Sequence, residues 1–127
     1  MVGLAVGIAL ALTIPSLDAA GSAADGFRLA DASGGCAYVT KRRLVACRSA
    51  RARSGFGLAA TGDPLTLPRA LARWPLPRRV LRSGAVWRRG GVTCRRSGRS
   101  AMCTNRSGAA IAVTPDGVAA LAAPASG

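Results

Sequence analysis

The clearest pattern along the chain lies between Trp87 and Val113, where short apolar and β-branched segments alternate with turns rich in Gly, Ser and Arg. Three such segments follow one another, and two of them carry Cys94 and Cys103. Short β-prone segments bounded by turn residues are typical of neighbouring antiparallel strands. The pattern therefore predicts three short strands, with the two cysteines close enough to be bonded.

A looser copy of this pattern occupies the preceding part of the chain. Residues 27–29 form a short strand candidate, followed by a turn-rich segment. Cys36 and Cys47 then enclose two β-prone segments around a basic turn at 41–43, which predicts a hairpin. Residues 54–61 predict a further strand, which ends at a Gly-Asp-Pro turn.

The last strands of the two copies resemble each other in detail. Residues 54–61 and 107–114 share an initial Ser-Gly, an apolar residue followed by Ala, and a final Thr. A Gly-Gly pair also precedes the first cysteine of each copy. We interpret residues 27–63 and 81–116 as two related three-stranded halves. Chance similarity between two strands rich in Ala and Gly is the alternative.

The connection between the halves, residues 64–80, differs in character because prolines punctuate Leu and Arg residues. Pro68 can begin one or two helical turns that end near Trp74, and the prolines that follow exclude a longer helix. We interpret this segment as a crossover. Residues 117–127 are rich in Ala and are predicted to be a flexible tail, so the folded domain is expected to span residues 25–116.

An apolar run of eleven residues, 4–14, opens the chain and is broken by Pro15. A membrane-spanning helix needs about 20 apolar residues. An apolar run of this length followed by small residues is typical of a secretory signal, although basic residues are missing before it. We predict a cleavable signal peptide at 1–24, cut after Ala24 or, as a second choice, after Ala23. A buried core helix is the alternative.

The chain has a formal net charge of +13, from seventeen Arg and one Lys against five Asp. A surface this basic favours polyanions and anionic membranes or walls. The alternatives are a solvated basic face and a high-GC genome, which also favours Arg over Lys. The candidate anion-binding residues in the second half are Arg88, Arg89, Arg95, Arg96, Arg99 and Arg106. The expected partners are anionic cell-wall polymer or lipid headgroups, with non-specific nucleic-acid binding as an alternative.

No catalytic constellation is found in the sequence. The chain has no His, which excludes Ser-His-Asp and Cys-His pairs and every His metal site. Three carboxylates of the domain lie within two residues of Gly, Ser or Pro, where Asp stabilises turns; they are Asp31, Asp63 and Asp116. We therefore expect a monomer that is not an enzyme and needs no cofactor.

Four cysteines in an exported chain are compatible with two disulfides. Three pairings can form, and the local pairs Cys36–Cys47 and Cys94–Cys103 suit hairpins whose arms lie side by side. Each would contribute roughly 2.5–3 kcal/mol by loop-entropy arguments. The two pairs enclose ten and eight residues, unlike the short Cys-x2-4-Cys spacing of a zinc knuckle. We expect no metal ligand.

Several motifs together resemble an uncharacterised family of small secreted actinobacterial proteins that carry a domain of unknown function. The family pattern is Leu-x-x-Gly-x-x-Trp, then Gly-Gly-x-x-Cys, then Cys-Thr-Asn-x-Ser-Gly. The matching segments are Phe27-Arg28, Ser33-Gly34 with Cys36, Cys47, Leu81 to Trp87, Gly90 to Cys94, and Cys103 to Gly108. The chain lacks the additional cysteine pair of many members, and residues 109–113 replace an aromatic, His-bearing strand end. The resemblance implies a fold and no activity.

These observations predict a mainly β, small disulfide-stapled domain of two related three-stranded halves, preceded by a signal peptide. The expected location is secreted or extracytoplasmic, in the cell envelope. The expected function is that of a cationic, non-catalytic interaction or structural module. The alternative is a secreted cationic effector that acts on foreign membranes or nucleic acid.

Overall fold

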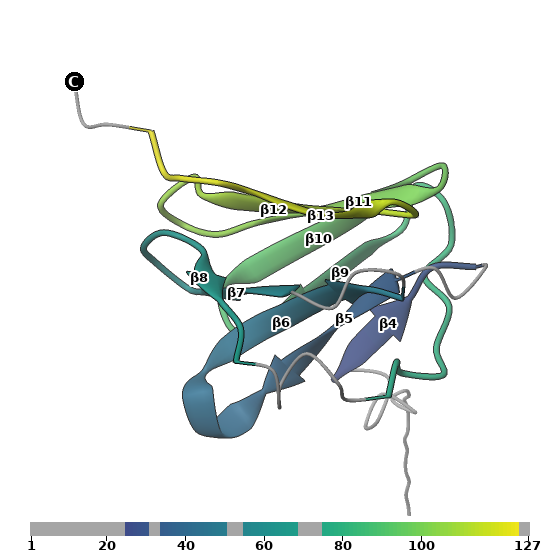
Figure 1. The fold of residues 1–127 in the computed structure, drawn as a ribbon, viewed down its shortest axis with the longest axis horizontal. Helices are drawn as coiled ribbons and strands as arrows, with labels where there is room; N and C mark the ends of the chain where they lie inside the picture. Colours follow the sequence, from purple (N-terminus) through teal and green to yellow (C-terminus); the bar gives the residue numbers. More distant parts are fainter. Residues whose placement is uncertain (1–24, 31–33, 51–54, 69–74, 125–127) are drawn as a thin grey trace, which may run out of the picture.

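The computed structural model describes residues 25–30, 34–50, 55–68 and 75–124. These residues form two antiparallel five-stranded sheets that stack on each other (Figure 1). The one helical element among them is a single 3-10 turn, Thr40–Arg42. No helix in these four ranges is long and apolar enough to cross a membrane. The predicted mainly β fold is confirmed.

The first sheet is a meander in which each strand pairs with the next along the chain. Its strands are β4 (Gly26–Arg28), β5 (Gly34–Val39), β6 (Leu44–Ser49), β7 (Gly55–Ala59) and β8 (Leu65–Thr66). The hairpin predicted around the basic turn is therefore β5–β6. Arg43 closes this turn with a left-handed backbone, φ 53°, and its N–H donates to the Thr40 carbonyl oxygen.

The second sheet has the same sequential topology. Its strands are β9 (Val86–Arg89), β10 (Val92–Ser97), β11 (Ser100–Thr104), β12 (Ala110–Thr114) and β13 (Gly117–Leu121). Gly90 and Gly91, with φ of 55° and 80°, form the two-residue turn between β9 and β10. Two consecutive positive φ values define the type I′ turn, which favours Gly at both positions.

The prediction of a flexible tail from residue 117 is wrong for residues 117–121. These residues form β13, which pairs antiparallel with β12 from Thr114 opposite Gly117 to Ala110 opposite Leu121. The Pro115–Asp116 turn reverses the chain, so backbone groups that would face water pair with β12 instead. The domain therefore extends beyond residue 116, and each sheet has five strands rather than three.

The two sheets pack face to face around one apolar core. Phe27, Val45 and Leu58 come from the first sheet, and all three are fully buried. Trp87 and Ile111 come from the second sheet, and the Trp87 ring meets Phe27 edge-on with ring centroids 5.4 Å apart. Strands β12 and β13 lie against β6 and β7 across this interface. Trp87 is thus a core residue.

The shared topology supports two related halves, but their alignment differs from the one based on sequence. Phe56 lies opposite Cys47, and Ile111 lies opposite Cys103. An alignment of the halves on their disulfides therefore matches Ile111 with Phe56. The alignment on the Ser-Gly pairs at 54–55 and 107–108 matches Ile111 with Leu58 instead. The cysteine spacings differ by two residues because the β5–β6 turn has four residues and the β10–β11 turn has two.

The crossover contributes to the first sheet at both of its ends. Leu65 and Thr66 form β8, and Leu67 then packs with Leu44 and Ala46 on the outer face of this sheet. Near the other end of the crossover, Val80 forms a parallel bridge with Arg28 in β4. The predicted helical turns at 69–74 and the predicted signal peptide at 1–24 lie outside the described residues, as does Asp31.

Candidate functional site

Both predicted disulfides form in the structure. Cys36 bonds to Cys47, and Cys94 bonds to Cys103. Each bond joins directly opposite residues of neighbouring strands, with Cα atoms 4.1 Å and 3.9 Å apart. All four residues are fully buried. Disulfides of this kind are typical of extracytoplasmic proteins.

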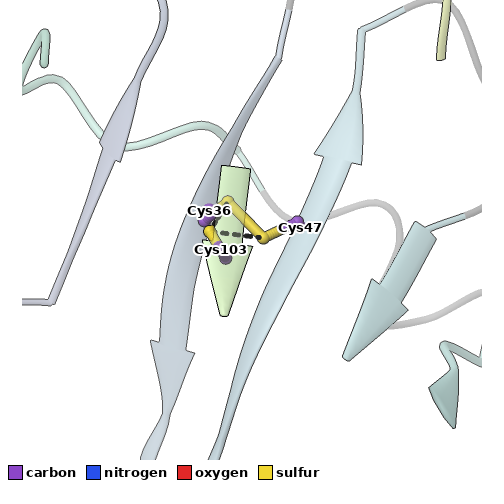
Figure 2. Close-up of side chains that lie close together, drawn as sticks. All are labelled: Cys36, Cys47 and Cys103. Carbon is purple, nitrogen blue, oxygen red and sulfur yellow. Dashed lines mark hydrogen bonds between the residues drawn. A yellow bond between two sulfur atoms is a disulfide. The ribbon is translucent and has the colours of Figure 1, made fainter. Parts of the chain in front are cut away.

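The two disulfides also meet each other at the centre of the core, which we call the cysteine cluster. The Cys103 Sγ lies 3.8 Å from the Cys36 Sγ and 3.9 Å from the Cys47 Sγ (Figure 2). A sulfur in a disulfide carries no proton, so these are van der Waals contacts rather than hydrogen bonds. The contact joins residues at least 56 positions apart, and no sequence spacing indicates it.

Five of the six candidate arginines lie in two groups at opposite ends of β10. Arg88, Arg89 and Arg106 lie near the Gly90–Gly91 turn, and the Arg106 Nε is next to Gly91. Arg96 and Arg99 lie at the β10–β11 turn, and Arg95 lies between the two groups, in the middle of β10. Five residue steps along β10, at about 3.4 Å each, separate the two turns by about 17 Å. The six arginines therefore do not form a single cluster.

Arg89 and Arg96 contact other residues of the protein. The Arg89 guanidinium lies 4.8 Å from the Tyr38 ring centroid, and its Nη2 lies 3.6 Å from the Asp25 Oδ1. The Arg96 Nη1 donates to the Leu81 carbonyl oxygen at 2.6 Å, and its Nε donates to the Gly98 carbonyl oxygen. Both side chains are half-buried. These contacts hold the two guanidinium groups against the protein, which leaves them less able to bind a ligand.

Arg88 and Arg95 project from the outer face of the second sheet, and both are exposed. Arg88 lies opposite Thr93, two residues before Arg95 on the neighbouring strand. Such diagonal neighbours on one face are about 7–8 Å apart. We call this outer face, with Arg88 and Arg95 at one side, the basic face. Strands β9–β13 carry no acidic residue.

Apolar side chains occupy the other side of the basic face. In register across the sheet, Arg95 is followed by Met102, Ala112 and Ala119. The neighbouring row ends in Leu121. Met102 is 47% exposed and Leu121 is 56% exposed. The basic face therefore combines cations on β9 and β10 with exposed apolar residues on β11 and β13, a combination that the sequence pattern does not indicate.

The first sheet presents its charges differently. Arg48 lies partly buried on β6, and this burial lowers the pKa of its guanidinium from the usual value. An Arg nevertheless stays charged in proteins. Lys41 and Arg42 are exposed in the β5–β6 turn. They form a short basic turn rather than a face.

Asn105, within the Cys-Thr-Asn-x-Ser-Gly motif, holds the two sheets together. Its Nδ2 donates to the carbonyl oxygens of Ala59 and Gly62 at 3.0 Å and 2.8 Å. Its Oδ1 accepts from the N–H groups of Ser107 and Ala109 at 3.1 Å and 3.0 Å. One side chain thus orders its own loop and joins it to the loop after β7. The motif has a structural role.

Replacing Asn105 with Ala should lower the free energy of unfolding by about 2–3 kcal/mol, because four hydrogen bonds are lost and polar backbone groups lose their partners. Chemical denaturation measures this change. Asn105→Asp is the matched control: it keeps the acceptor oxygens but sets a carboxylate against the Ala59 and Gly62 carbonyls, so it should also destabilise. A loss below 0.5 kcal/mol, the size of an ordinary surface change, would contradict the proposed role.

The two described carboxylates of the predicted turns lie where expected. Asp63 follows β7, and its Oδ1 accepts from the Ala123 N–H at 2.9 Å. Asp116 lies in the β12–β13 turn, where its N–H donates to the Thr114 Oγ1. The predicted turn location is confirmed for both residues.

No protein family model matches the chain, and the chain matches no curated protein and no solved structure. The resemblance described above therefore stays a prediction.

Proposed function

We propose that this protein is an extracytoplasmic binding module that attaches through its basic face to anionic polymer or lipid headgroups of the cell envelope. The observation that carries the proposal is the exposed pair Arg88 and Arg95 on a sheet whose strands contain no acidic residue. An exposed pair of cations without acidic neighbours on the same strands attracts polyanions without requiring a pocket.

The basic face suits this role better than the other arginine groups do. Arg89 and Arg96 are engaged with Tyr38 and with loop carbonyl groups. The outer face of the first sheet is partly covered by Leu67. In the second sheet, by contrast, Arg88 and Arg95 face solvent together. Their diagonal spacing lets both contact one extended polyanion or two neighbouring headgroups.

The chemistry available in the domain favours binding over catalysis. The chain has no His, the Asp63 Oδ1 accepts from the Ala123 N–H, and Asp116 lies in the β12–β13 turn. General acid–base catalysis requires a titratable group positioned at a reacting atom. A rigid, disulfide-bonded sandwich with a basic surface is therefore proposed to act by adhesion, as an interaction or structural module.

Replacing both Arg88 and Arg95 with Gln should weaken binding to vesicles containing phosphatidylglycerol by about 30-fold, because each arginine near an anionic surface contributes about 1 kcal/mol. Binding to a phosphate-rich wall polymer should weaken as well. The affinity of the unmodified protein should fall steeply as salt rises. Vesicle co-sedimentation and polymer pull-down at several salt concentrations measure these effects.

The matched control removes the same charge from another surface. Lys41→Gln/Arg42→Gln takes two exposed cations from the β5–β6 turn and leaves the basic face intact. It should weaken binding several-fold less than the Arg88 and Arg95 variant does. Equal losses in the two variants would show that only bulk charge matters, and the proposed face would then be wrong.

A third variant separates the two kinds of partner. Met102→Ser removes an exposed apolar side chain from the basic face and changes no charge. It should weaken attachment to vesicles, where an apolar side chain can enter the interface, and leave polymer binding unchanged. If Met102→Ser weakened binding to the polymer and left binding to vesicles unchanged, the proposed role of Met102 at the lipid interface would be wrong.

A further inference from the structure

We infer that this protein forms a symmetric dimer in which β13 of one copy pairs antiparallel with β13 of a second copy. The second sheets of the two copies then join into one continuous sheet, with a twofold axis at Ala119. This dimer does not depend on the proposed function, and it differs from the monomer that we expect from the sequence.

The first sheet offers no open edge for such pairing. The edge of β4 is occupied, because the Arg28 N–H donates to the Arg79 carbonyl oxygen and the Leu81 N–H donates to the Arg28 carbonyl oxygen. At the other edge, β8 has only two residues and lies between Pro64 and Pro68. Short strands, prolines and covering segments are devices that keep sheet edges from pairing with another chain.

In the second sheet, β13 is the outer strand that lacks such protection. The other outer strand, β9, has Arg88 and Arg89 among its four residues. The five residues of β13 include no charged residue and no Pro. After β13 the chain turns toward the loop after β7, where the Ala123 N–H donates to the Asp63 Oδ1. Among the described residues, no strand pairs with the side of β13 that faces away from β12. Backbone groups on this side can therefore bond to an added strand.

Contacts within one chain do not require the glycine at position 117, where β13 begins. The φ of Gly117 lies outside the left-handed region, and a Cβ added there would meet no atom within 4 Å beyond its chain neighbours. Glycine weakens a strand because it has no side chain to pack, and in a strand it often marks a close approach by another group. We therefore expect the open space beside Gly117 to be filled by the second copy.

A register centred on Ala119 places Leu121 of the second copy in that space. The twofold axis sets each residue of β13 opposite the residue that is equally far from Ala119 in the other copy. Leu121 then lies opposite Gly117, and opposite residues of antiparallel strands point to the same face and touch. Leu121 is 56% exposed in one chain. The longest side chain of β13 thus meets the residue that has none, at both ends of the strand pair.

The distribution of charge favours this edge for contact between two copies. A chain with a formal net charge of +13 repels its own copies most strongly where their arginines meet. Arg88 and Arg95 lie on β9 and β10, at the side of the second sheet away from β13. Three strand spacings of about 4.8 Å separate β10 from β13, so Arg95 of the two copies would be about 30 Å apart. This distance is well beyond the screening length of about 8 Å at physiological salt.

The small contact area determines the strength of the dimer. Each copy contributes one strand of five residues. Interfaces that bury less than about 1,200 Å² belong to weak, reversible complexes. Backbone hydrogen bonds supply the affinity in such strand addition, and side chains fix the register. We therefore expect a dimer that dissociates on dilution.

The test compares the sedimentation of the oxidised protein and of Gly117→Val over a wide range of protein concentration. The unmodified protein should show a reversible monomer–dimer equilibrium. Gly117→Val should raise the dissociation constant by at least about 10-fold, because valine fills the space that Leu121 of the second copy needs. Its free energy of unfolding in dilute solution should not fall, because the valine meets open space within one chain. Thr104→Val is the matched control. Thr104 is exposed on β11, two strands from the edge, so this change should leave the dimer intact.

A cross-link tests the register separately and does not rely on the valine variant. Ala119 is exposed and would lie opposite its own counterpart, where Cα atoms are about 4.5–5.5 Å apart and a disulfide can form. Ala119→Cys should therefore give a covalent dimer under mild oxidation, far more than Thr104→Cys does. A monomer at every concentration, equal cross-linking of the two cysteine variants, or unchanged dimerisation of Gly117→Val would overturn the inference. Growth into ever larger species would show that β13 pairs with a different edge, and it would overturn the inference as well.

Discussion

Replacing Cys36 and Cys47 with Ala should lower the free energy of unfolding by about 2–5 kcal/mol, the usual cost of losing a native disulfide in a small secreted domain. Two causes act together. The open chain gains conformational freedom in the unfolded state, and the removed sulfurs leave a void beside Cys103, which they contact in the folded protein. A domain of this size has only a few kcal/mol to lose.

Urea denaturation of the oxidised protein and of the variant measures this difference. Cys94→Ala/Cys103→Ala should give a similar loss, because the second disulfide occupies the equivalent position in the other sheet. Thr104→Ala is the surface control on the same hairpin, and it should change stability by no more than about 0.5 kcal/mol. A cysteine variant that loses less than 1 kcal/mol would show that the disulfide does not stabilise this core.

Phe27→Ala should lower the free energy of unfolding by about 3–5 kcal/mol, as is typical when a buried aromatic ring is truncated. Phe27 lies on β4 and is 0% exposed, and its ring packs edge-on against Trp87 of β9. The ring therefore connects the first strand of one sheet to the first strand of the other. Loss of the ring leaves a cavity between the sheets and removes the edge-on contact with Trp87.

Thermal unfolding followed by Trp fluorescence measures this effect, since about 1 kcal/mol corresponds to 4–8 °C in a domain of this size. Phe27→Leu keeps most of the apolar volume and should cost less than half as much as Phe27→Ala. Val80→Ala changes a side chain that is 39% exposed and should be nearly neutral. Equal effects of the Leu and Ala variants at residue 27 would contradict a packing role for the ring.

The two disulfide-bonded hairpins of this protein could be predicted from its sequence because their determinants are local. The cysteines of each pair lie three residues from either side of their turn. Antiparallel pairing then places those cysteines directly opposite each other. The disulfide pairing, the hairpins and the mainly β class all follow from these short-range relations.

The local sequence pattern did not predict strand β13, because its pairing with β12 is not accompanied by a clear alternation of apolar and polar residues. Residues 117–121 are small and weakly patterned, and their sequence resembles a tail. They form β13 because the preceding turn directs them along β12, whose free edge offers unpaired backbone groups. Backbone hydrogen bonding to an existing strand depends little on side-chain type, so this strand leaves only a weak signal in the sequence.

Only the tertiary structure decided which distant residues meet. The sequence predicted that Cys103 would pair within its hairpin, but the packing of two sheet faces places its sulfur against Cys36 and Cys47. The same packing sets Asn105 against Ala59 and Gly62. The pairing within each sheet, in turn, divides the arginines between two ends of β10 and leaves Arg88 and Arg95 together on one face. Such contacts depend on how strands twist and stack, because residues far apart in the chain are brought together only by the burial of complementary surfaces.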